Sequence, residues 1–390
     1  MLKPDTEEGV ADAIRQAAED LGPLQLCGGG TRLGLGRPVQ AAETLSLAAL
    51  NEVSLYEPGE LTLVVQAGMP MDDLHALLDA EDQQLTFEPP DHRALLGSEG
   101  TPTIGGAIAA GASGPRRLRM GAARDALLGI RYVNGSGEVL RAGGRVMKNV
   151  TGYDVPKLLC GAYGTLGAIT EIGLKTMPKV ETVVTLALRG LADAEAVAAM
   201  ADALRTPTDI SAAAHLPAAI AASLGFDTAV TLVRVEGFEA QAAYRIGALE
   251  TALGGHGELT RIDTDPWPAI RDVQPFAGDA RAVWRLSMKA TDAPALVAEL
   301  RERTECDAFY DWGGGLVWLA VPPGEDAQEP AIRSALASRG GHATLIRAPD
   351  AIRAAVPVFQ PESEPIAALS ARIERAFDPK GILNPGRMRA

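Results

Sequence analysis

The spacing of apolar residues along the first part of the chain predicts a mixture of helices and strands. A first helix is expected to end before Gly22-Pro23, with an apolar face made of Val10, Ile14, Ala17 and Leu21. Continuous apolar runs predict strands at residues 24–27, 61–67 and 168–177, and residues 71–78 have a helical pattern. A hairpin is expected around Asn134-Gly135, between residues 130–133 and 139–141.

The pattern changes after Pro178, where strands and helices alternate. Strands are predicted at residues 183–188, 229–235, 283–288, 316–321 and 343–346, and helices at 192–204, 240–253, 293–303 and 327–338. This order is typical of an α+β domain with helices packed on a mostly antiparallel sheet. No internal repeat of fixed period is visible. An amphipathic helix around residues 366–377 and a turn-rich tail at 378–386 follow.

Composition indicates a soluble globular protein without a direct nucleic-acid partner. The chain has 390 residues, 47% hydrophobic and 22% charged, and a formal net charge of −14. Nucleic acids and anionic membranes both require a basic face, so both are excluded as direct partners. The three cysteines, Cys27, Cys160 and Cys306, include no close pair, which argues against a disulfide framework or an iron–sulfur cluster held by this chain. No signal peptide and no membrane span are expected.

Three glycine-dense segments in the first half of the chain point to a large phosphate-bearing cofactor. They lie at residues 27–32, 103–114 and 161–170. Glycines allow a backbone to approach a ligand closely, and successive exposed amides can line a concavity for a pyrophosphate. No G-x-G-x-x-G fingerprint follows a strand, since Gly34-Leu-Gly36 leads into Pro38, and no P-loop is present. A Rossmann dehydrogenase and a P-loop enzyme are therefore not expected.

The order of these motifs resembles the vanillyl-alcohol oxidase/p-cresol methylhydroxylase (PCMH) family of flavoproteins. The resemblance rests on residues 28–31, 103–111, 121–125, 148–154 and 164–170, and the tail at 378–386 is similar to the 2-hydroxy-acid branch of that family. Within the branch, residues 146–154, 311–314, 340–344 and 385–388 resemble the FAD-binding subunits of bacterial glycolate oxidases.

The resemblance implies an α+β fold in three stretches. Residues 1–178 would form a two-subdomain FAD-binding PCMH-type domain, residues 179–348 an α+β, ferredoxin-like cap that carries the substrate site, and residues 349–390 a segment that returns to the FAD domain. The first loop has no histidine for a flavin linkage, and Cys27 and Cys160 are expected to be small buried residues. Non-covalent FAD is therefore predicted.

The same resemblance assigns the cofactor-binding residues. The pyrophosphate would be wrapped by Gly28, Gly29, Gly30, Thr31 and Arg32. Thr103, Ile104, Gly105, Gly106, Ala109 and Gly111 would run beside the pyrophosphate and the flavin, with Gly121 and Asp125 close by. Backbone groups of Gly164, Gly167 and Ile169 would hold the adenine end.

Oxidation of a 2-hydroxy acid requires a cation for the carboxylate and a base for the hydroxyl proton. The candidates are Arg116, which could equally meet flavin phosphate or solvent, Arg285, for which a structural ion pair is the alternative, and His342, an acid/base candidate by resemblance. No metal site is predicted, because the five histidines show no ligand spacing and the H-x-G-D-G-N-x-H motif of related enzymes is missing. His215 follows an alanine run and is expected to have no ionisable neighbour.

The function implied by the resemblance is that of an FAD-binding subunit of a glycolate (2-hydroxy-acid) oxidase or dehydrogenase complex. Electrons would pass through FAD to partners, namely a second flavin subunit and an iron–sulfur subunit. The expected location is cytoplasmic, with the complex peripheral on the inner face of the plasma membrane. Two alternatives remain open: a non-catalytic flavin-binding or scaffold subunit, and an NADPH-dependent flavin reductase of the same fold.

Overall fold

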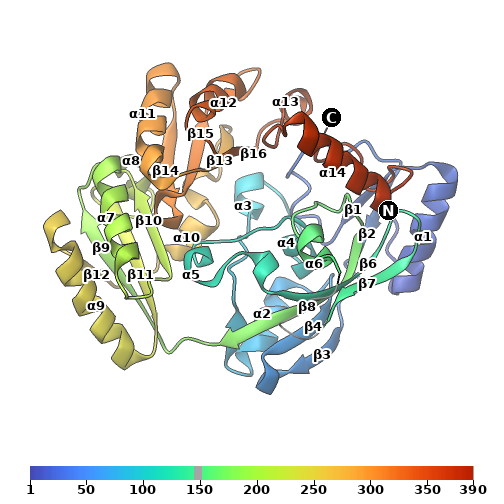
Figure 1. Cartoon of the computed structure of the whole chain (residues 1–390), viewed down its shortest axis with the longest axis horizontal. Helices are drawn as coiled ribbons and strands as arrows, with labels where there is room; N and C mark the ends of the chain where they lie inside the picture. The colour runs from blue at the N-terminus through green and yellow to red at the C-terminus, as the bar shows by residue number, and fades with distance from the viewer. Residues whose placement is uncertain (145–151, 390) are drawn as a thin grey trace. The chain divides into compact units, whose positions relative to one another are not determined.

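The computed structural model describes residues 1–144 and 152–389 and divides the chain into two compact units (Figure 1). Unit 1 comprises Met1–Ser113, Gly121–Lys179 and Pro361–Ala390, and unit 2 comprises Gly114–Met120 and Val180–Gln360. Apart from a shift of one residue at Lys179, these ranges differ from the expected stretches in two places. Residues 114–120 belong to unit 2, and the chain returns to unit 1 at Pro361 and not at residue 349.

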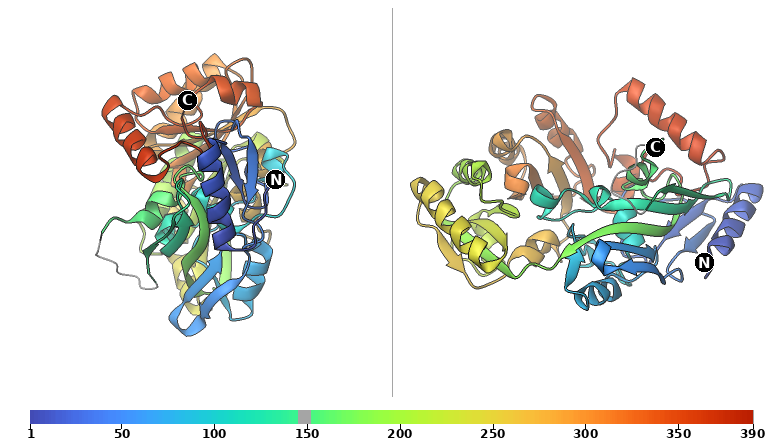
Figure 2. Two further views of the ribbon diagram at one scale, coloured as in Figure 1. Left: turned by 90° about the vertical axis from the view of Figure 1, so that its right-hand side faces the viewer. Right: turned by 60° about the horizontal axis from the view of Figure 1, so that its bottom comes forward.

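The N-terminal helix of unit 1 forms as its apolar spacing predicts. Helix α1 (Glu7–Asp20) begins after Thr6, whose side chain accepts a hydrogen bond from the amide of Gly9 at 3.1 Å. It lies beside the parallel strands β1 (Leu24–Cys27) and β2 (Glu43–Ser46) (Figure 2). The buried residues between them form one apolar core, which includes Val10, Ile14, Leu24, Leu45 and Leu383.

A larger antiparallel sheet forms the rest of unit 1. Its strands, in spatial order, are β3 (Val53–Glu57), β4 (Thr62–Gln66), β8 (Ala168–Pro178), β6 (Leu127–Val133) and β7 (Val139–Gly143), and β5 (Gln83–Leu85) pairs with β8. The short helices of this unit are α2 (Met71–Asp79), α3 (Arg93–Leu96), α4 (Ile104–Ala109) and α6 (Val155–Leu159). Apolar residues of α2 and α4 pack into the core of this sheet. The predicted hairpin is confirmed as β6 and β7.

The C-terminal segment completes unit 1. Helix α14 (Glu364–Phe377) packs Ile373 and Phe377 against the core of the larger sheet. The tail then runs beside β1, where the amide of Leu24 donates to the carbonyl of Ile382 at 2.7 Å and the amide of Asn384 donates to the carbonyl of Leu24 at 2.9 Å. Residues far apart in the sequence thus share one hydrogen-bonded layer.

Unit 2 is built on one antiparallel sheet of eight strands. Their spatial order is β12 (Thr260–Ile262), β9 (Thr182–Arg189), β11 (Val230–Gly237), β10 (Ala212–Leu216), β14 (Asp307–Asp311), β15 (Leu316–Val321), β13 (Ala282–Ser287) and β16 (His342–Arg347). Helices α7 (Asp193–Arg205), α9 (Glu239–Leu253), α11 (Ala293–Arg303) and α12 (Glu329–Ala337) contribute to an apolar core on one face of the sheet. Shorter helices are α5 (Arg117–Met120), α8 (Ala218–Ala222), α10 (Trp267–Arg271) and α13 (Asp350–Ala355).

The sheet of unit 2 contains the same substructure twice. The first copy runs β9-α7-β10-β11-α9-β12 and the second runs β13-α11-β14-β15-α12-β16, and each has the strand order 4-1-3-2 of a ferredoxin-like fold. The second strands of the two copies, β10 and β14, pair at the junction. The α+β class predicted for this region is confirmed. The sequence shows no repeat of fixed period, and the order of elements was hidden because β10, β12 and β14 were not predicted.

Residues 114–120 contact unit 2 at several points. The indole nitrogen of Trp312 donates to the carbonyl of Gly114 at 3.1 Å, and the Arg117 guanidinium lies 4.4 Å from the centre of the Trp312 ring. Leu118 packs against the apolar core, and Arg119 pairs with Asp209 at 2.6 Å. This short segment is therefore an integral part of unit 2.

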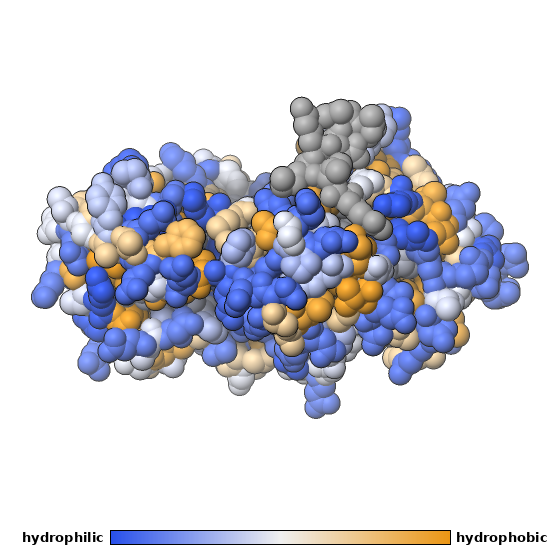
Figure 3. All heavy atoms as spheres, turned by 90° about the horizontal axis from the view of Figure 1, so that it is seen from below, coloured by the Kyte–Doolittle hydropathy of each residue, from blue (hydrophilic) through white to orange (hydrophobic). Residues whose placement is uncertain are grey.

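The described helices include none with both the length and the apolar character needed to cross a bilayer. Hydrophilic residues cover most of the face seen in Figure 3, with apolar residues in small groups between them.

Candidate functional site

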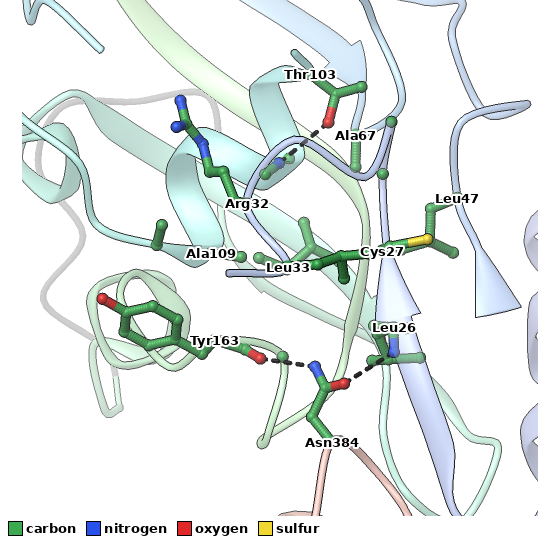
Figure 4. A pocket seen from close by; sticks show the side chains of 18 of the residues that line it. Leu26, Cys27, Arg32, Leu33, Leu47, Ala67, Thr103, Ala109, Tyr163 and Asn384 are labelled. Atoms are coloured by element: carbon green, nitrogen blue, oxygen red, sulfur yellow. Dashed lines mark hydrogen bonds between the residues drawn. The ribbon is translucent and has the colours of Figure 1, made fainter. Parts of the chain in front are cut away.

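A pocket in unit 1 brings all three glycine-dense segments together (Figure 4). Its empty volume is about 730 Å³, which includes solvent at its mouth. The lining residues are Leu26, Cys27, Gly28, Gly29, Gly30, Thr31, Arg32, Leu33, Leu47, Ala67, Thr103, Gly105, Gly106, Ala109, Ala110, Tyr163, Gly164, Gly167, Ala168, Ile169, Asn384 and Arg387. Strand β1, helix α4, the loop before β8 and the tail each contribute to it.

The first loop follows β1 and needs its glycines for two different reasons. A Cβ on Gly29 would lie 1.8 Å from the carbonyl oxygen of Thr101, and one on Gly28 would lie 2.3 Å from Oγ1 of Thr103. Neighbouring protein atoms, and not a ligand, therefore exclude side chains there. Gly30 is different, because it has φ of +85° and a Cβ would meet nothing within 4 Å. Gly30 is thus the glycine of this loop whose bare backbone faces open space.

The second segment forms helix α4 and not an extended loop. Thr103 caps it, with Oγ1 accepting a hydrogen bond from the amide of Gly106 at 3.2 Å. The backbone of Gly105 packs directly against Ala67, the residue that follows β4. A Cβ on Gly105 would lie only 2.5 Å from the carbonyl oxygen of Ala67. This close packing places the start of α4 against the wall formed by Ala67.

The tail holds the third segment in place through Asn384. Its side-chain amide donates to the carbonyl of Tyr163 at 2.7 Å, and its Oδ1 accepts from the amide of Leu26 at 2.9 Å (Figure 4). Asn384 is buried, and both Tyr163 and Gly164 have positive φ. One side chain therefore fixes the spacing between β1 and the loop before β8.

The pocket is cationic although the chain as a whole is acidic. Arg32 and Arg387 line it, and none of the described lining residues is an aspartate or glutamate. The Arg32 guanidinium donates to the carbonyl of Pro90 at 2.8 Å, and that of Arg387 donates to the carbonyl of Leu35 at 2.8 Å. Backbone carbonyls thus orient both guanidinium groups, and two arginines in the wall suit a ligand that carries phosphate.

Most of the predicted cofactor residues line this pocket. They are Gly28, Gly29, Gly30, Thr31, Arg32, Thr103, Gly105, Gly106, Ala109, Gly164, Gly167 and Ile169. The other four lie elsewhere: Ile104 is fully buried in the core, Gly111 packs against Gly161, and Asp125 closes a turn with Gly121 by accepting from the amide of Ala122 at 2.8 Å. The structure therefore gives these four residues no place in the pocket wall.

Sequence reasoning missed ten lining residues. They are Leu26, Cys27, Leu33, Leu47, Ala67, Ala110, Tyr163, Ala168, Asn384 and Arg387. Asn384 lies in the tail motif at 378–386 and Arg387 in the motif at 385–388, so the signal was present, but nothing in these motifs shows that the tail lies beside β1. The motif at 146–154 falls largely on residues 145–151, which are outside the described residues.

The cysteines are sheltered thiols. Burial raises the pKa of Cys27 despite a hydrogen bond with Ser46, and burial raises the pKa of Cys160 to about 11. Both thiols therefore stay protonated at neutral pH, although the two cysteines are half-buried and not fully buried as predicted. The described residues include no group of histidine, cysteine or acidic side chains that could hold a metal ion.

Arg116 does not have the surroundings expected of a substrate-binding cation. It lies in unit 2, buried, and its guanidinium donates two hydrogen bonds to the carboxylate of Glu236, at 3.0 and 3.2 Å. A bidentate pair of this kind satisfies both charges, so Arg116 is a structural residue.

Arg285 and His342 come together on adjacent strands. In the pairing of β13 with β16, Arg285 lies opposite Thr344 and Ser287 lies opposite His342. Arg285 and His342 are therefore diagonal neighbours on one face of the sheet. The structural ion pair considered for Arg285 is not found. Within the described part of the chain, its guanidinium makes no hydrogen bond or ion pair.

The fold and the site define a FAD-binding protein of the PCMH type. Residues 1–143 match the family model of the FAD binding domain. The solved structure of 4-ethylphenol oxidase from Gulosibacter chungangensis is similar with a TM-score of 0.74 and 17% identity, covering 99% of this chain and 88% of that chain. p-Cresol methylhydroxylase with substrate bound gives a TM-score of 0.71 and 15% identity, with the same coverage. At these identities the likeness concerns the fold.

Sequence similarity to a curated relative extends over almost the whole chain. The glycolate oxidase subunit GlcE of Escherichia coli K12 is 33% identical over 387 residues, covering 99% of this chain and 98% of that protein. This chain belongs to the same family of FAD-linked oxidoreductase proteins as GlcE, and its cofactor is FAD. The glycolate oxidase subunit GlcD of Bacillus subtilis is 33% identical over 221 residues, and this match covers 56% of the chain and 44% of GlcD.

Proposed function

We propose that this protein is the FAD-binding subunit of a complex that oxidises a small 2-hydroxy acid, glycolate being the first candidate. The observation that carries the proposal is the end-to-end similarity to GlcE, together with a pocket of small residues and two arginines that suits a flavin dinucleotide. Similarity to the D-2-hydroxyglutarate dehydrogenase of Xanthomonas citri pv. viticola, 36% over 188 residues, supports the 2-hydroxy-acid class; this match covers 38% of that enzyme.

FAD would supply the two-electron chemistry that turns an alcohol carbon into a carbonyl. The residues of this chain would hold and orient it. Arg32 and Arg387 would face the diphosphate, with the bare backbone of Gly30 beside it, and Asn384 would keep the walls at a fixed separation. The flavin is expected to be bound without a covalent link.

Electrons would leave through partner chains. The three cysteines are free and the described residues form no metal cluster, so a second flavin subunit and an iron–sulfur subunit are proposed as partners. Association with the inner face of the plasma membrane would then be indirect, through that assembly.

The proposal is tested by anaerobic reduction of the purified complex with glycolate. Bleaching of the oxidised flavin within the turnover time supports it, and acid precipitation should release the flavin into the supernatant. A complex whose flavin is reduced by no small 2-hydroxy acid would overturn the proposal.

A second candidate function is a flavin-binding subunit that does not itself perform the oxidation. The pairing of Arg116 with Glu236 favours it, because that pair removes one of the three candidate catalytic groups. The two functions are separated by the chain purified alone with FAD. Flavin reduction by glycolate in the isolated chain supports catalysis here, whereas reduction only in the assembled complex supports the second candidate.

A further inference from the structure

The second ferredoxin-like copy presents a small polar cluster on the face of the sheet opposite its main apolar core. Trp284 and Leu286 of β13 belong to that core. Because side chains alternate along a strand, Arg285 and Ser287 project from the opposite face.

Strand pairing places the other members of this cluster. Arg285 lies opposite Trp318 of β15 on one side and Thr344 of β16 on the other, and His342 lies opposite Ser287. Residues directly opposite each other in an antiparallel pair have Cβ atoms about 5 Å apart, and diagonal neighbours about 7 Å. We call Arg285, Ser287, Trp318, His342 and Thr344 the Arg285 cluster.

Arg285 is an exception among the sheltered arginines of unit 2. The other buried or half-buried arginines there each have an acidic partner, or in the case of Arg117 a tryptophan ring: Arg116, Arg117, Arg234, Arg245, Arg271, Arg281, Arg333, Arg339, Arg347 and Arg353. Arg285 is half-buried, and among the described residues its guanidinium has neither an acidic partner nor a tryptophan ring.

A half-buried cation without a counter-charge lowers stability unless a ligand supplies the missing anion. The planar guanidinium matches a carboxylate, which can accept two parallel hydrogen bonds from it. The hydroxyl groups of Thr344 and Ser287 and the imidazole of His342 can pair with a second polar group on the same small molecule. Trp318, buried and stacked 6.4 Å from Phe309, gives the cluster a rigid apolar wall.

We propose that the Arg285 cluster binds the carboxylate of a small 2-hydroxy or 2-oxo acid, with Arg285 as the carboxylate ligand and Thr344 and His342 beside the substituent at the second carbon. This inference rests on the proposed function, because it names the substrate contact of that reaction. It also assigns unit 2 an anion site of its own, which binding measurements can detect without turnover.

The test uses the full chain loaded with FAD and oxalate, a carboxylate without an oxidisable hydroxyl. Calorimetry compares the wild type with Arg285→Gln and Arg285→Lys, and Arg261→Gln on the exposed edge strand β12 is the matched control. Loss of a charge-assisted, bidentate contact is expected to weaken oxalate binding by roughly 10- to 100-fold in Arg285→Gln and less in Arg285→Lys. Arg261→Gln should bind like the wild type.

Thermal melting distinguishes a ligand-binding arginine from a structural one. Arg285→Gln should melt at the same temperature as the wild type or higher, since no internal partner is lost. Oxalate binding within twofold of the wild type in Arg285→Gln, or a melting temperature several degrees lower, would overturn the inference. Failure of the proposed function looks different: glycolate would then leave the flavin of the wild-type complex oxidised, whatever the oxalate titration shows.

Discussion

The hydroxyl of Tyr310 donates a 2.7 Å hydrogen bond to Oδ2 of Asp193, and this contact joins the two ferredoxin-like copies of unit 2. Asp193 begins α7 of the first copy, and Tyr310 lies on β14 of the second. Tyr310 is also the strand partner of His215, whose Nε2 lies 3.5 Å from Oδ1 of Asp193. The expectation that His215 has no ionisable neighbour was therefore wrong: α7 brings a carboxylate to it.

Asp193→Asn should destabilise the protein at neutral pH but not in acid. Burial opposes the charge of Asp193, but hydrogen bonds from His215 and Tyr310 and the charge of Arg301 outweigh it and lower its pKa to about 2. A carboxylate whose pKa is depressed on folding adds stability above its unfolded pKa, and this is lost as the pH falls towards 2. The variant should lose about 2 kcal/mol at pH 7.

Denaturant titrations of the two proteins between pH 7 and pH 2 measure this difference. The gap in unfolding free energy should close between about pH 4 and pH 2. Asp20→Asn, at an exposed position of α1, is the control, and its unfolding free energy should follow that of the wild type at every pH. A gap that stays constant down to pH 2 would contradict the assignment of the effect to the Asp193 charge.

Alanine at Gly30 should weaken FAD binding at little cost to folding, whereas alanine at Gly29 should chiefly impair folding of the loop. Gly30→Ala should cost only about 1–2 kcal/mol for its left-handed backbone, because its Cβ meets no protein atom, yet it should weaken FAD binding at least roughly tenfold. Gly29→Ala should disrupt the loop itself, since its Cβ would overlap Thr101. Flavin fluorescence titration and thermal melting of the apoprotein separate the two outcomes.

Gly97 provides the matched control for this pair. It has φ of +61°, its Cβ would also meet no atom within 4 Å, and it does not line the pocket. Gly97→Ala should therefore share the backbone cost of Gly30→Ala and keep normal FAD affinity. Equal affinity of all three variants for FAD would show that the cofactor does not approach this loop.

Arg32→Gln should weaken FAD binding and make the remaining affinity less dependent on salt. The guanidinium lines a pocket with no described acidic residue, so its loss removes part of the attraction for the diphosphate. A loss of roughly tenfold, about 1.4 kcal/mol, is expected at low ionic strength. Arg141→Gln, on the exposed strand β7, is the control. Unchanged affinity and salt dependence in Arg32→Gln would place the diphosphate elsewhere.

Asn384→Ala should both destabilise unit 1 and lower its affinity for FAD. The change leaves the amide of Leu26 and the carbonyl of Tyr163 without their side-chain partner, at a cost of about 1–3 kcal/mol. Asn51→Ala, the same change at an exposed position, should be neutral. Melting curves with and without FAD measure both effects; a variant that melts like the wild type would contradict the bridging role of Asn384.

FAD should protect Cys27 from alkylation. Cys27 lines the pocket, whereas Cys160 and Cys306 do not. All three thiols have pKa values raised chiefly by burial, so each should react slowly with iodoacetamide at pH 8. Mass spectrometry should show that added FAD slows the reaction of Cys27 alone. Equal slowing at all three cysteines would indicate that FAD reduces the dynamics of the whole protein and does not shield Cys27 directly.

The sequence predicted elements well where apolar runs are bounded by glycine or proline. Residues 316–321 form β15 without a shift of either end, and residues 168–177 correspond to β8 (Ala168–Pro178). Two of the strands that it missed, β10 and β14, have compositions that hide them. β10 is Ala-Ala-Ala-His-Leu, which has no preference for a strand, and β14 begins and ends with aspartate. Burial within the sheet, and not local propensity, makes them strands.

The candidate site was predictable where a motif lies in one loop and not where folding brings distant residues together. The glycines of the first loop were predicted as part of the site. Gly28 and Gly29 are required there mainly because Thr103 and Thr101 leave no room for a Cβ, and the sequence alone does not reveal this contact. The pairing of Arg116 with Glu236 and the missing counter-charge of Arg285 depend on strand register across unit 2. Only the three-dimensional structure separates these two arginines.

The position of Asn384 and Arg387 in the pocket wall sets an order of events during biosynthesis. A nascent chain on the ribosome can form β1 and its loop early, but that wall stays open until codons 384 to 387 have been translated and the tail has docked. Flavin capture would therefore wait until this tail has been translated, and a product terminated before residue 384 is expected to emerge colourless.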